Sequence, residues 1–311
     1  LQLYATYDVS EKIEIALLGN IAYNTYNFIP ENRETSFGNL YEMLKLKIYF
    51  DGQELDCFSS MFGALALTYK PKTDLQLKFI ASAFSTDETV NYDIQGQYWL
   101  SETGLGYEDE QGLERGIGTY IEHARNHLEA SIFNFEHKGY KTLGSGKLSW
   151  GAKIQGELIY DKVNEWKMVD SAGYTIPSSF GIVGVYDSVV APSLQNTFKS
   201  NNDMTSTRLT AYLQRDWNKT TSWGRWFANV GARVMYWSFN NEVFFSPRAG
   251  ISFSPAKNPN LLFRLAGGIY AQSPFYKELR NEQGEINPDI RSQKSWHTVL
   301  SSDWTFEMLD R

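Results

Sequence analysis

Residues 147–161, KLSWGAKIQGELIYD, alternate between an apolar and a mainly polar face without interruption. A period of two residues is typical of a β-strand, whose successive side chains point to opposite faces. The segment is much longer than the ~5–6 residues that are common for strands in soluble sheets. Its apolar face carries Leu148, Trp150, Ala152, Ile154, Gly156, Leu158 and Tyr160, and the other carries Lys147, Ser149, Gly151, Lys153, Gln155, Glu157 and Ile159.

The same alternation recurs along the whole chain and predicts about eleven strands joined as an antiparallel up-and-down sheet. Short turns alternate with long connections, with one exception near residue 240, so the short turns gather at one end of the sheet. Long extracellular loops are predicted over about 24–57, 100–118, 161–204 and 272–293. The predicted strands cover 1–9, 12–23, 58–70, 75–83, 119–137, 147–161, 205–217, 225–239, 243–254, 261–273 and 294–306.

The aromatic residues distinguish a transmembrane barrel from a soluble sheet. Trp150 and Tyr160 lie ten residues apart on one face, and Trp226 and Tyr236 repeat that spacing in another strand. Ten residues span ~33 Å along a strand, or ~23 Å along the membrane normal at a tilt near 45°. The apolar band of an outer-membrane barrel is ~25 Å tall and has aromatic girdles at both edges. The pattern therefore predicts Trp at the inner interface and Tyr at the outer one, although four core aromatics of a soluble β-sandwich remain the alternative.

Composition limits the other classes of protein. The chain has 311 residues, 42% hydrophobic and 15% aromatic, with a mean hydropathy of −0.40. No stretch has the ~20 apolar residues of a membrane-spanning helix. The net charge of −7 argues against a nucleic-acid partner. The single cysteine, Cys57, lies in no metal-binding spacing.

The motif EHARNH places His123 and His127 four residues apart, as in some helical metal sites. On a strand they are ~13 Å apart, too far for one ion. The same arithmetic separates His127 from Ser131, so no catalytic residue, metal ligand or cofactor is predicted. The polar faces are predicted to line a lumen, as a substrate path, a plug contact or simply a solvated wall. The predicted lumen residues are His123, Arg125, His127, Glu129, Lys153, Gln155, Glu157, Arg208, Arg233 and Arg264.

Aromatic residues in the predicted loops are candidates for ligand capture, because binding groups concentrate on loops held by a rigid scaffold. They could stack on sugars or on the rings of a chelate, or they could pack the loops together. These residues are Tyr26, Phe28, Tyr41, Trp166, Tyr174 and Tyr186.

The last third of the chain resembles the C-terminal barrel half of TonB-dependent outer-membrane receptors of Gram-negative bacteria. The resemblance lies in SPRAGISF (246–253), LLFRLAGGIYAQSPFYKEL (261–279), NPDIRSQKSWH (287–297) and SSDW (301–304), which occur in the order seen in the family. It implies a 22-stranded barrel with a plugged lumen, of which the eleven predicted strands are about half. Residues 1–311 are therefore expected to be part of a single transmembrane β-barrel domain. The plug, the TonB box and the closing strands are expected to lie outside this segment.

The resemblance also implies a function that involves no covalent chemistry. Extracellular loops and a plug would capture a scarce iron chelate, corrinoid, glycan or peptide. The TonB–ExbB–ExbD complex would then drive its import across the bacterial outer membrane. Outer-membrane lipid is an expected partner, and a surface lipoprotein is a further candidate. The alternatives are a passive porin and a barrel-embedded hydrolase, which would need a Ser–His pair on neighbouring strands.

Overall fold

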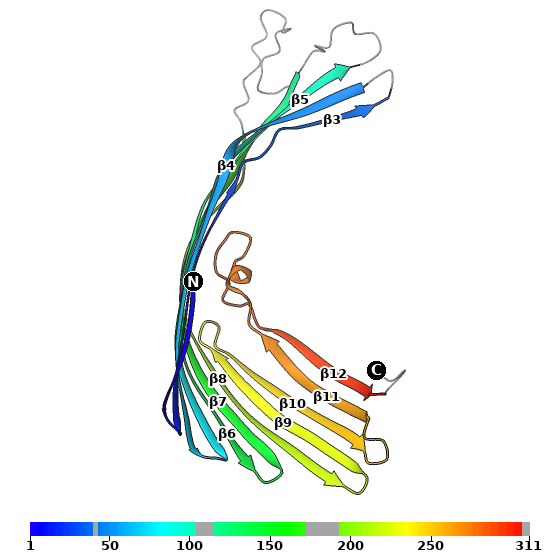
Figure 1. The fold of residues 1–311 in the computed structure, drawn as a ribbon. Helices are drawn as coiled ribbons and strands as arrows, with labels where there is room; N and C mark the ends of the chain where they lie inside the picture. The colour runs from blue at the N-terminus through cyan, green and yellow to red at the C-terminus, as the bar shows by residue number, and fades with distance from the viewer. Residues whose placement is uncertain (40–42, 104–114, 172–192, 307–311) are drawn as a thin grey trace, which may run out of the picture.

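The computed structural model describes residues 1–39, 43–103, 115–171 and 193–306. They form one antiparallel, twelve-stranded sheet with one short 3-10 helix, η1 (Figure 1). The sheet is open, with β1 at one edge and β12 at the other. The strands are β1 (Gln2–Ser10), β2 (Ile13–Phe28), β3 (Arg33–Gly38), β4 (Met43–Lys72), β5 (Leu75–Thr103), β6 (Arg115–Leu143), β7 (Gly146–Ser171), β8 (Ser193–Thr221), β9 (Gly224–Trp237), β10 (Glu242–Pro255), β11 (Leu261–Gln272) and β12 (Gln293–Trp304).

The predicted all-β, up-and-down fold is confirmed, since every strand on the main path pairs with its neighbours in chain order. The strand β3 alone stands off this path. It pairs with the first residues of β4, beyond the point where β2 ends. Both β2 and β3 pair with β4, one after the other along its length, so they share one position in the sheet. The twelve strands therefore fill eleven side-by-side positions, as the sequence pattern predicted.

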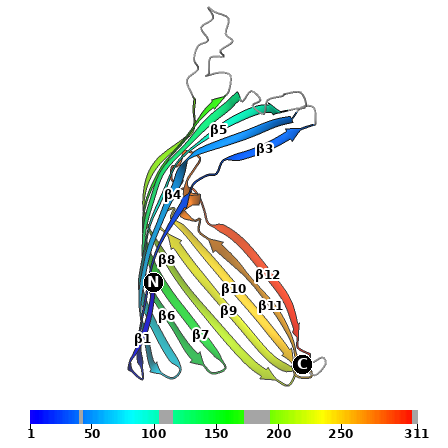
Figure 2. The ribbon, with the colours of Figure 1, turned by 45° about the horizontal axis from the view of Figure 1, so that its top comes forward.

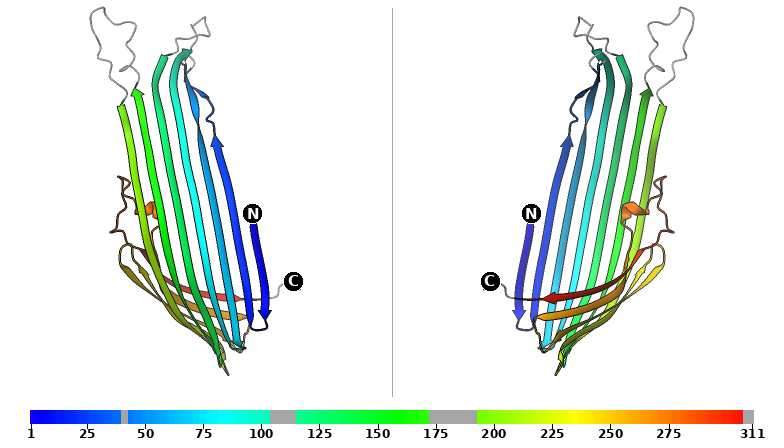
Figure 3. Two further views of the ribbon diagram at one scale, coloured as in Figure 1. Left: turned by 90° about the vertical axis from the view of Figure 1, so that its left-hand side faces the viewer. Right: turned by 90° about the vertical axis from the view of Figure 1, so that its right-hand side faces the viewer.

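The strands differ greatly in length. The strands β4 to β8 contain 26 to 30 residues, whereas β9 to β12 contain 12 to 14. The sheet therefore has a tall part, β4 to β8, and a short part, β9 to β12. Figures 2 and 3 show the tall strands rising beyond the ends of the short ones.

The tall strands correct the predicted loop boundaries. Strand pairing continues into 24–57, 100–118 and 161–204, all of which were expected to be loops. Alternation of polar and apolar residues reveals a strand only where one face is apolar. Backbone hydrogen bonds continue where both faces meet water, and the pattern gives no signal there. Residues 40–42, 104–114 and 172–192 of these ranges lie outside the described part of the chain.

The fourth predicted loop, 272–293, corresponds to the connection between the end of β11 and the start of β12. Residues 273–292, here called the strap, carry η1 (Tyr276–Leu279). The strap lies on the concave side of the curved sheet (Figure 1). There it forms a small apolar core in which Leu279 packs with Met204 and Trp237.

Register assigns every strand residue to a face, because residues directly opposite each other in an antiparallel pair share one. Met204 and Trp237 contact the strap and therefore mark the concave face. Leu158 and Val230 belong to the opposite, convex face. Within the described residues, no helix is long and apolar enough to cross a membrane.

Candidate functional site

The convex face carries a continuous band of exposed apolar side chains, here called the apolar belt. Leu158 is 49% exposed and Val230 is 53% exposed. No second sheet or helix of the described chain covers them. An uncovered apolar surface of this extent marks a contact with another apolar phase. The belt comprises Leu17, Ile21, Met61, Leu65, Phe133, Phe135, Ile154, Leu158, Leu209, Leu213, Val230, Val234, Phe245, Ile251, Leu265, Ile269 and Leu300.

Aromatic side chains lie at both edges of the belt. Near the short turns, the ring of Trp150 covers the backbone of Gly139, where a side chain would collide with it. Trp226 packs against Phe253 with ring centroids 4.3 Å apart. At the opposite edge lie Tyr160 and Tyr236, which the structure places on the same convex face as the two tryptophans.

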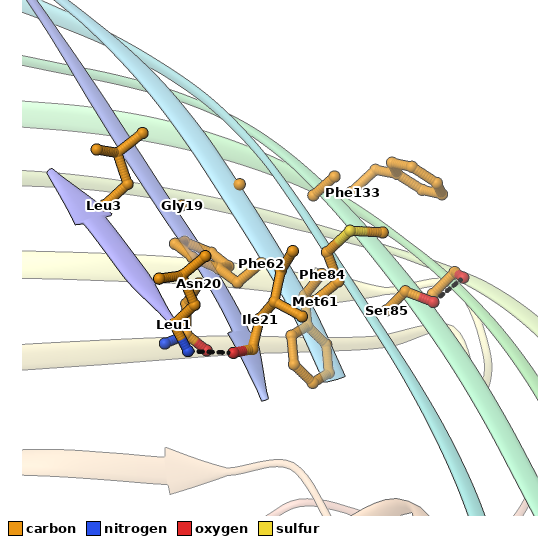
Figure 4. A pocket seen from close by; sticks show the side chains of 13 residues that line it. Leu1, Leu3, Gly19, Asn20, Ile21, Met61, Phe62, Phe84, Ser85 and Phe133 are labelled. Carbon is orange, nitrogen blue, oxygen red and sulfur yellow. Dashed lines mark hydrogen bonds between the residues drawn. The ribbon is translucent and has the colours of Figure 1, made fainter. Parts of the chain in front are cut away.

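A groove of about 540 Å³ crosses the belt over β1, β2, β4, β5 and β6 (Figure 4). It forms because Gly19 and Gly63 pair directly and leave the surface without side chains, while Ala83 continues the row on β5. Leu3, Ile21 and other apolar groups line most of it. The groove is therefore a feature of the apolar belt, and it offers no cluster of charged groups for a polar ligand.

The concave face carries a connected polar network at the depth of the belt. Lys153 donates to Gln155 at 2.7 Å, and Gln155 donates to Glu157 at 2.5 Å. These residues alternate along β7, so all three point to the same face. Glu157 is only 4% exposed and also pairs with Arg208 on β8, with Nε to Oε1 at 2.9 Å.

Trp237 completes this network from the neighbouring strand. Its indole N–H donates to the hydroxyl of Ser206 at 3.2 Å, and that hydroxyl donates to Glu157 at 2.6 Å. The guanidinium of Arg208 lies 4.3 Å from the centroid of the indole ring, a cation–π geometry. The buried carboxylate is therefore both charge-paired and hydrogen-bonded, as a charge in such a place requires.

The strap is fixed to β7 by a buried carboxylate. Asp161, 5% exposed, accepts hydrogen bonds from the hydroxyl of Tyr276 at 3.0 Å and from Arg280 at 3.2 Å. Burial and the nearby Asp161 charge raise the pKa of Tyr276, so its hydroxyl remains a donor at neutral pH. Asn202 of β8 donates to the carbonyl of Gly284 at 2.8 Å and fixes the middle of the strap.

The end of the strap is fixed to the hairpin between β9 and β10. Ser292 donates to Glu242 through its hydroxyl at 2.6 Å and its backbone N–H at 3.0 Å. Arg291 donates to the carbonyl of Asn240, while the Asn240 amide donates to the carbonyl of Ile290. The strap therefore occupies the space beyond this short hairpin, on the concave face of the taller strands β7 and β8.

The register divides the predicted lumen residues between both faces. Six of them lie on the concave face. The four from β6 lie on the convex face, because their partners on β7 share the face of Tyr160. The prediction that all ten share one face is therefore wrong for His123, Arg125, His127 and Glu129. The concave residues are Lys153, Gln155, Glu157, Arg208, Arg233 and Arg264.

The error has a physical cause. On β6 the convex side chains are Phe133 and Phe135 within the belt, and they become polar from Glu129 outward. A polar stripe predicts the lumen only where the other face meets lipid. Beyond the belt, the outside of the sheet meets water too.

A charged cluster occupies this outer part of the convex face. Asp93 lies six residues beyond Asp87 on β5, which places it ~14 Å further from the belt for a tilted strand. It accepts a hydrogen bond from Arg125 and pairs with His123 at 2.6 Å. Partial burial alone would raise the pKa of Asp93, but the hydrogen bonds from Arg125 and His123 outweigh it and lower this pKa.

Those candidate ligand-capture aromatics that the structure describes do not gather at one place. Tyr26 and Phe28 stack at 6.4 Å near the outer end of β2, on the concave face. Trp166 stacks on His123 at 4.8 Å on the convex face. Tyr41, Tyr174 and Tyr186 lie outside the described residues. The strap, whose inward position the sequence did not predict, is the better-defined inner element.

One Ser–His contact bears on the hydrolase alternative. The hydroxyl of Ser295 lies 3.0 Å from Nε2 of His297, but both belong to the edge strand β12 and are exposed. No carboxylate among the described residues forms an ion pair with His297. This contact joins two residues of one strand, whereas the hydrolase alternative needs a Ser–His pair on neighbouring strands.

Comparisons with known proteins give the following matches. No family model and no curated protein matches the sequence. The siderophore receptor PiuA from Acinetobacter baumannii is similar in structure, with a TM-score of 0.41 and 11% identity over 98% of this chain and 52% of that one. The ferric-catecholate import receptor Fiu from E. coli K12, in its closed form, gives a TM-score of 0.24 and 9% identity over 98% of this chain and 60% of Fiu. The chain thus spans about half the length of PiuA.

Proposed function

We propose that this chain forms part of the barrel wall of a TonB-dependent outer-membrane receptor, which imports a scarce ligand by active transport. The uncovered apolar belt on the convex face, edged by Trp150 and Tyr160, carries the proposal. Such a surface suits contact with lipid hydrocarbon. The height of the belt matches the hydrocarbon thickness of an outer membrane, and the edges of the belt carry the amphipathic rings that headgroup layers favour.

The shape of the sheet supports a barrel. Lipid does not tolerate unpaired strand edges, and a curved antiparallel sheet removes its edges by closing on itself. In the proposed assembly, β1 and β12 therefore pair with further strands. The order of the resembling motifs in residues 246–304 supports a receptor of the TonB-dependent type over other barrels.

The concave face provides the proposed transport path. The Glu157–Arg208 network and the strap hold charged and hydrogen-bonding groups inside the curve of the sheet. Polar groups at membrane depth mark a water-filled path or a contact with an inner plug. The ligand in this proposal is an iron chelate, a corrinoid, a glycan or a peptide, captured at the tall end and passed along this face. Import is coupled to the TonB–ExbB–ExbD complex.

The test uses the full-length protein in its native outer membrane. Mass spectrometry of the purified protein identifies a co-purified ligand, and uptake of that ligand is measured in cells with and without a functional TonB protein. Uptake that requires both the receptor and TonB supports the proposal. TonB-independent uptake together with stable conductance in planar bilayers would establish a passive porin instead.

A further inference from the structure

A compact group of potential metal ligands lies just beyond the outer edge of the apolar belt. Asp87 of β5 and the β6 residues His127 and Glu129 each offer one ligand atom, and these atoms all lie within 4.8 Å of one another. Asp87 stands directly opposite Glu129, which in turn stands opposite Tyr160. The group therefore lies at the level where Tyr160 marks the outer edge of the belt.

Like charges placed directly opposite each other destabilise a pair of strands unless a cation compensates them. Asp87 and Glu129 are such a pair, and no lysine or arginine among the described residues forms an ion pair with either. His127 is their shared neighbour, with Nε2 lying 3.3 Å from Asp87 and 3.4 Å from Glu129.

These distances are long for a charge-assisted hydrogen bond, and they also match the separation of two ligands of one ion. A charge-assisted N–H···O bond is ~2.7–2.9 Å long. Two ligands of a tetrahedral ion with bonds of ~2.0–2.2 Å lie ~3.3–3.6 Å apart. His123 and Asp93 provide an internal comparison on the same two strands and the same face, and their 2.6 Å contact is an ordinary ion pair.

We propose that Asp87, His127 and Glu129 bind a divalent transition-metal ion, of which Zn²⁺ is the model case. One imidazole nitrogen and two carboxylate oxygens suit Zn²⁺ and its neighbours rather than Ca²⁺ or Mg²⁺, which prefer oxygen ligands alone. A tetrahedral ion held by three protein ligands would take its fourth ligand from water. The ion links β5 to β6 at the rim of the belt and neutralises the two opposed carboxylates. This inference does not depend on the transport activity proposed above.

The test measures metal binding by the full-length receptor in detergent, after treatment with a chelator. Isothermal titration with ZnCl₂ follows binding, and the absorption of Co²⁺ in place of Zn²⁺ reports whether the ion is tetrahedral. We expect one Zn²⁺ equivalent to be lost, or its affinity to fall at least ~10–100-fold, in His127→Gln and Glu129→Gln. The matched control His123→Gln, on the same strand and face, is expected to bind as the unmodified protein does.

Three results would overturn the site. They are unchanged Zn²⁺ affinity in His127→Gln, an equal loss in His123→Gln, and Ca²⁺ competing for the equivalent as well as Zn²⁺ does. If His127→Gln does not fold, Asp87→Asn provides the second variant. The unfolding temperatures of this variant and of the unmodified protein are then measured with and without Zn²⁺. We expect Zn²⁺ to raise the unfolding temperature of the unmodified protein alone, because only that protein keeps the complete site.

Discussion

Arg208 and Glu157 form an ion pair across β7 and β8, with Nε 2.9 Å from Oε1, on the concave face at the depth of the apolar belt. The Glu157 side chain is 5% exposed and that of Arg208 is 22% exposed. The Glu157 carboxylate is almost fully shielded from water, and the Arg208 side chain is partly shielded. Each therefore depends on the other for the stability of its charge.

Replacing Glu157 with glutamine is expected to lower the free energy of unfolding by ~2–3 kcal/mol, because Arg208 then loses its charged partner in a buried place. Urea unfolding of the detergent-solubilised protein measures the effect. Glu136→Gln is the matched control, since Glu136 pairs with Lys138 at 3.0 Å on the same face but is more exposed. That change is expected to cost less than ~1 kcal/mol. Equal losses in the two variants would contradict a special role for Glu157.

A single charge introduced into the apolar belt is expected to destabilise the protein in the membrane. Val230→Arg places a cation among the exposed apolar residues of the convex face and is expected to cost ~2–4 kcal/mol near the bilayer midplane. Asn229→Arg, one residue earlier on β9, points to the concave face and is expected to be tolerated. Insertion of each variant into lipid vesicles, followed by heat-modified gel mobility, compares the two. A tolerated Val230→Arg would argue against lipid contact.

The strap is expected to loosen when its buried anchor loses its charge. Asp161→Asn weakens the hydrogen bonds from Tyr276 and Arg280. Hydrogen exchange of peptides covering 273–292 should become at least ~10-fold faster, which corresponds to a loss of about 1.4 kcal/mol. Asp203→Asn, on the exposed convex face of β8, provides the control and should leave these peptides unchanged. A strap that exchanges at the same rate in both variants would show that Asp161 does not hold it.

The outer charged cluster is expected to respond to acid. The folded-state pKa of Asp93 lies below its usual value of 3.8, so its contribution to stability is present above about pH 3.8 and is lost as the pH falls through the folded pKa. The unfolding temperature of Asp93→Asn should therefore lie below that of the unmodified protein at pH 7. The difference should disappear at lower pH. It is expected to be small, because the Asp93 side chain is 56% exposed. A difference that does not shrink as the pH falls below 3.8 would contradict this role.

The sequence predicted the strands of the belt well, because each has one face toward an apolar phase and the other toward polar groups, and this produces a clear alternation. Strands β9 to β12 deviate from their predicted ranges by only one or two residues at most ends. The tall ends of β4 to β8 were not predicted, because both of their faces meet water and polar residues occur on each. The inward position of the strap was also not predicted, since Asp161 lies more than a hundred residues from Tyr276 and Arg280 in the sequence.

The sequence by itself determined the period of two, the length of the strand segments within the belt and the aromatic spacing that sets the height of the belt, because these are local consequences of crossing a membrane. Only the tertiary structure decided which face each polar stripe of β6 occupies. It also brought His127 beside Asp87, forty residues earlier in the chain. Register joins side chains across strands, and one strand's alternation carries no information about the residue that its neighbour places opposite.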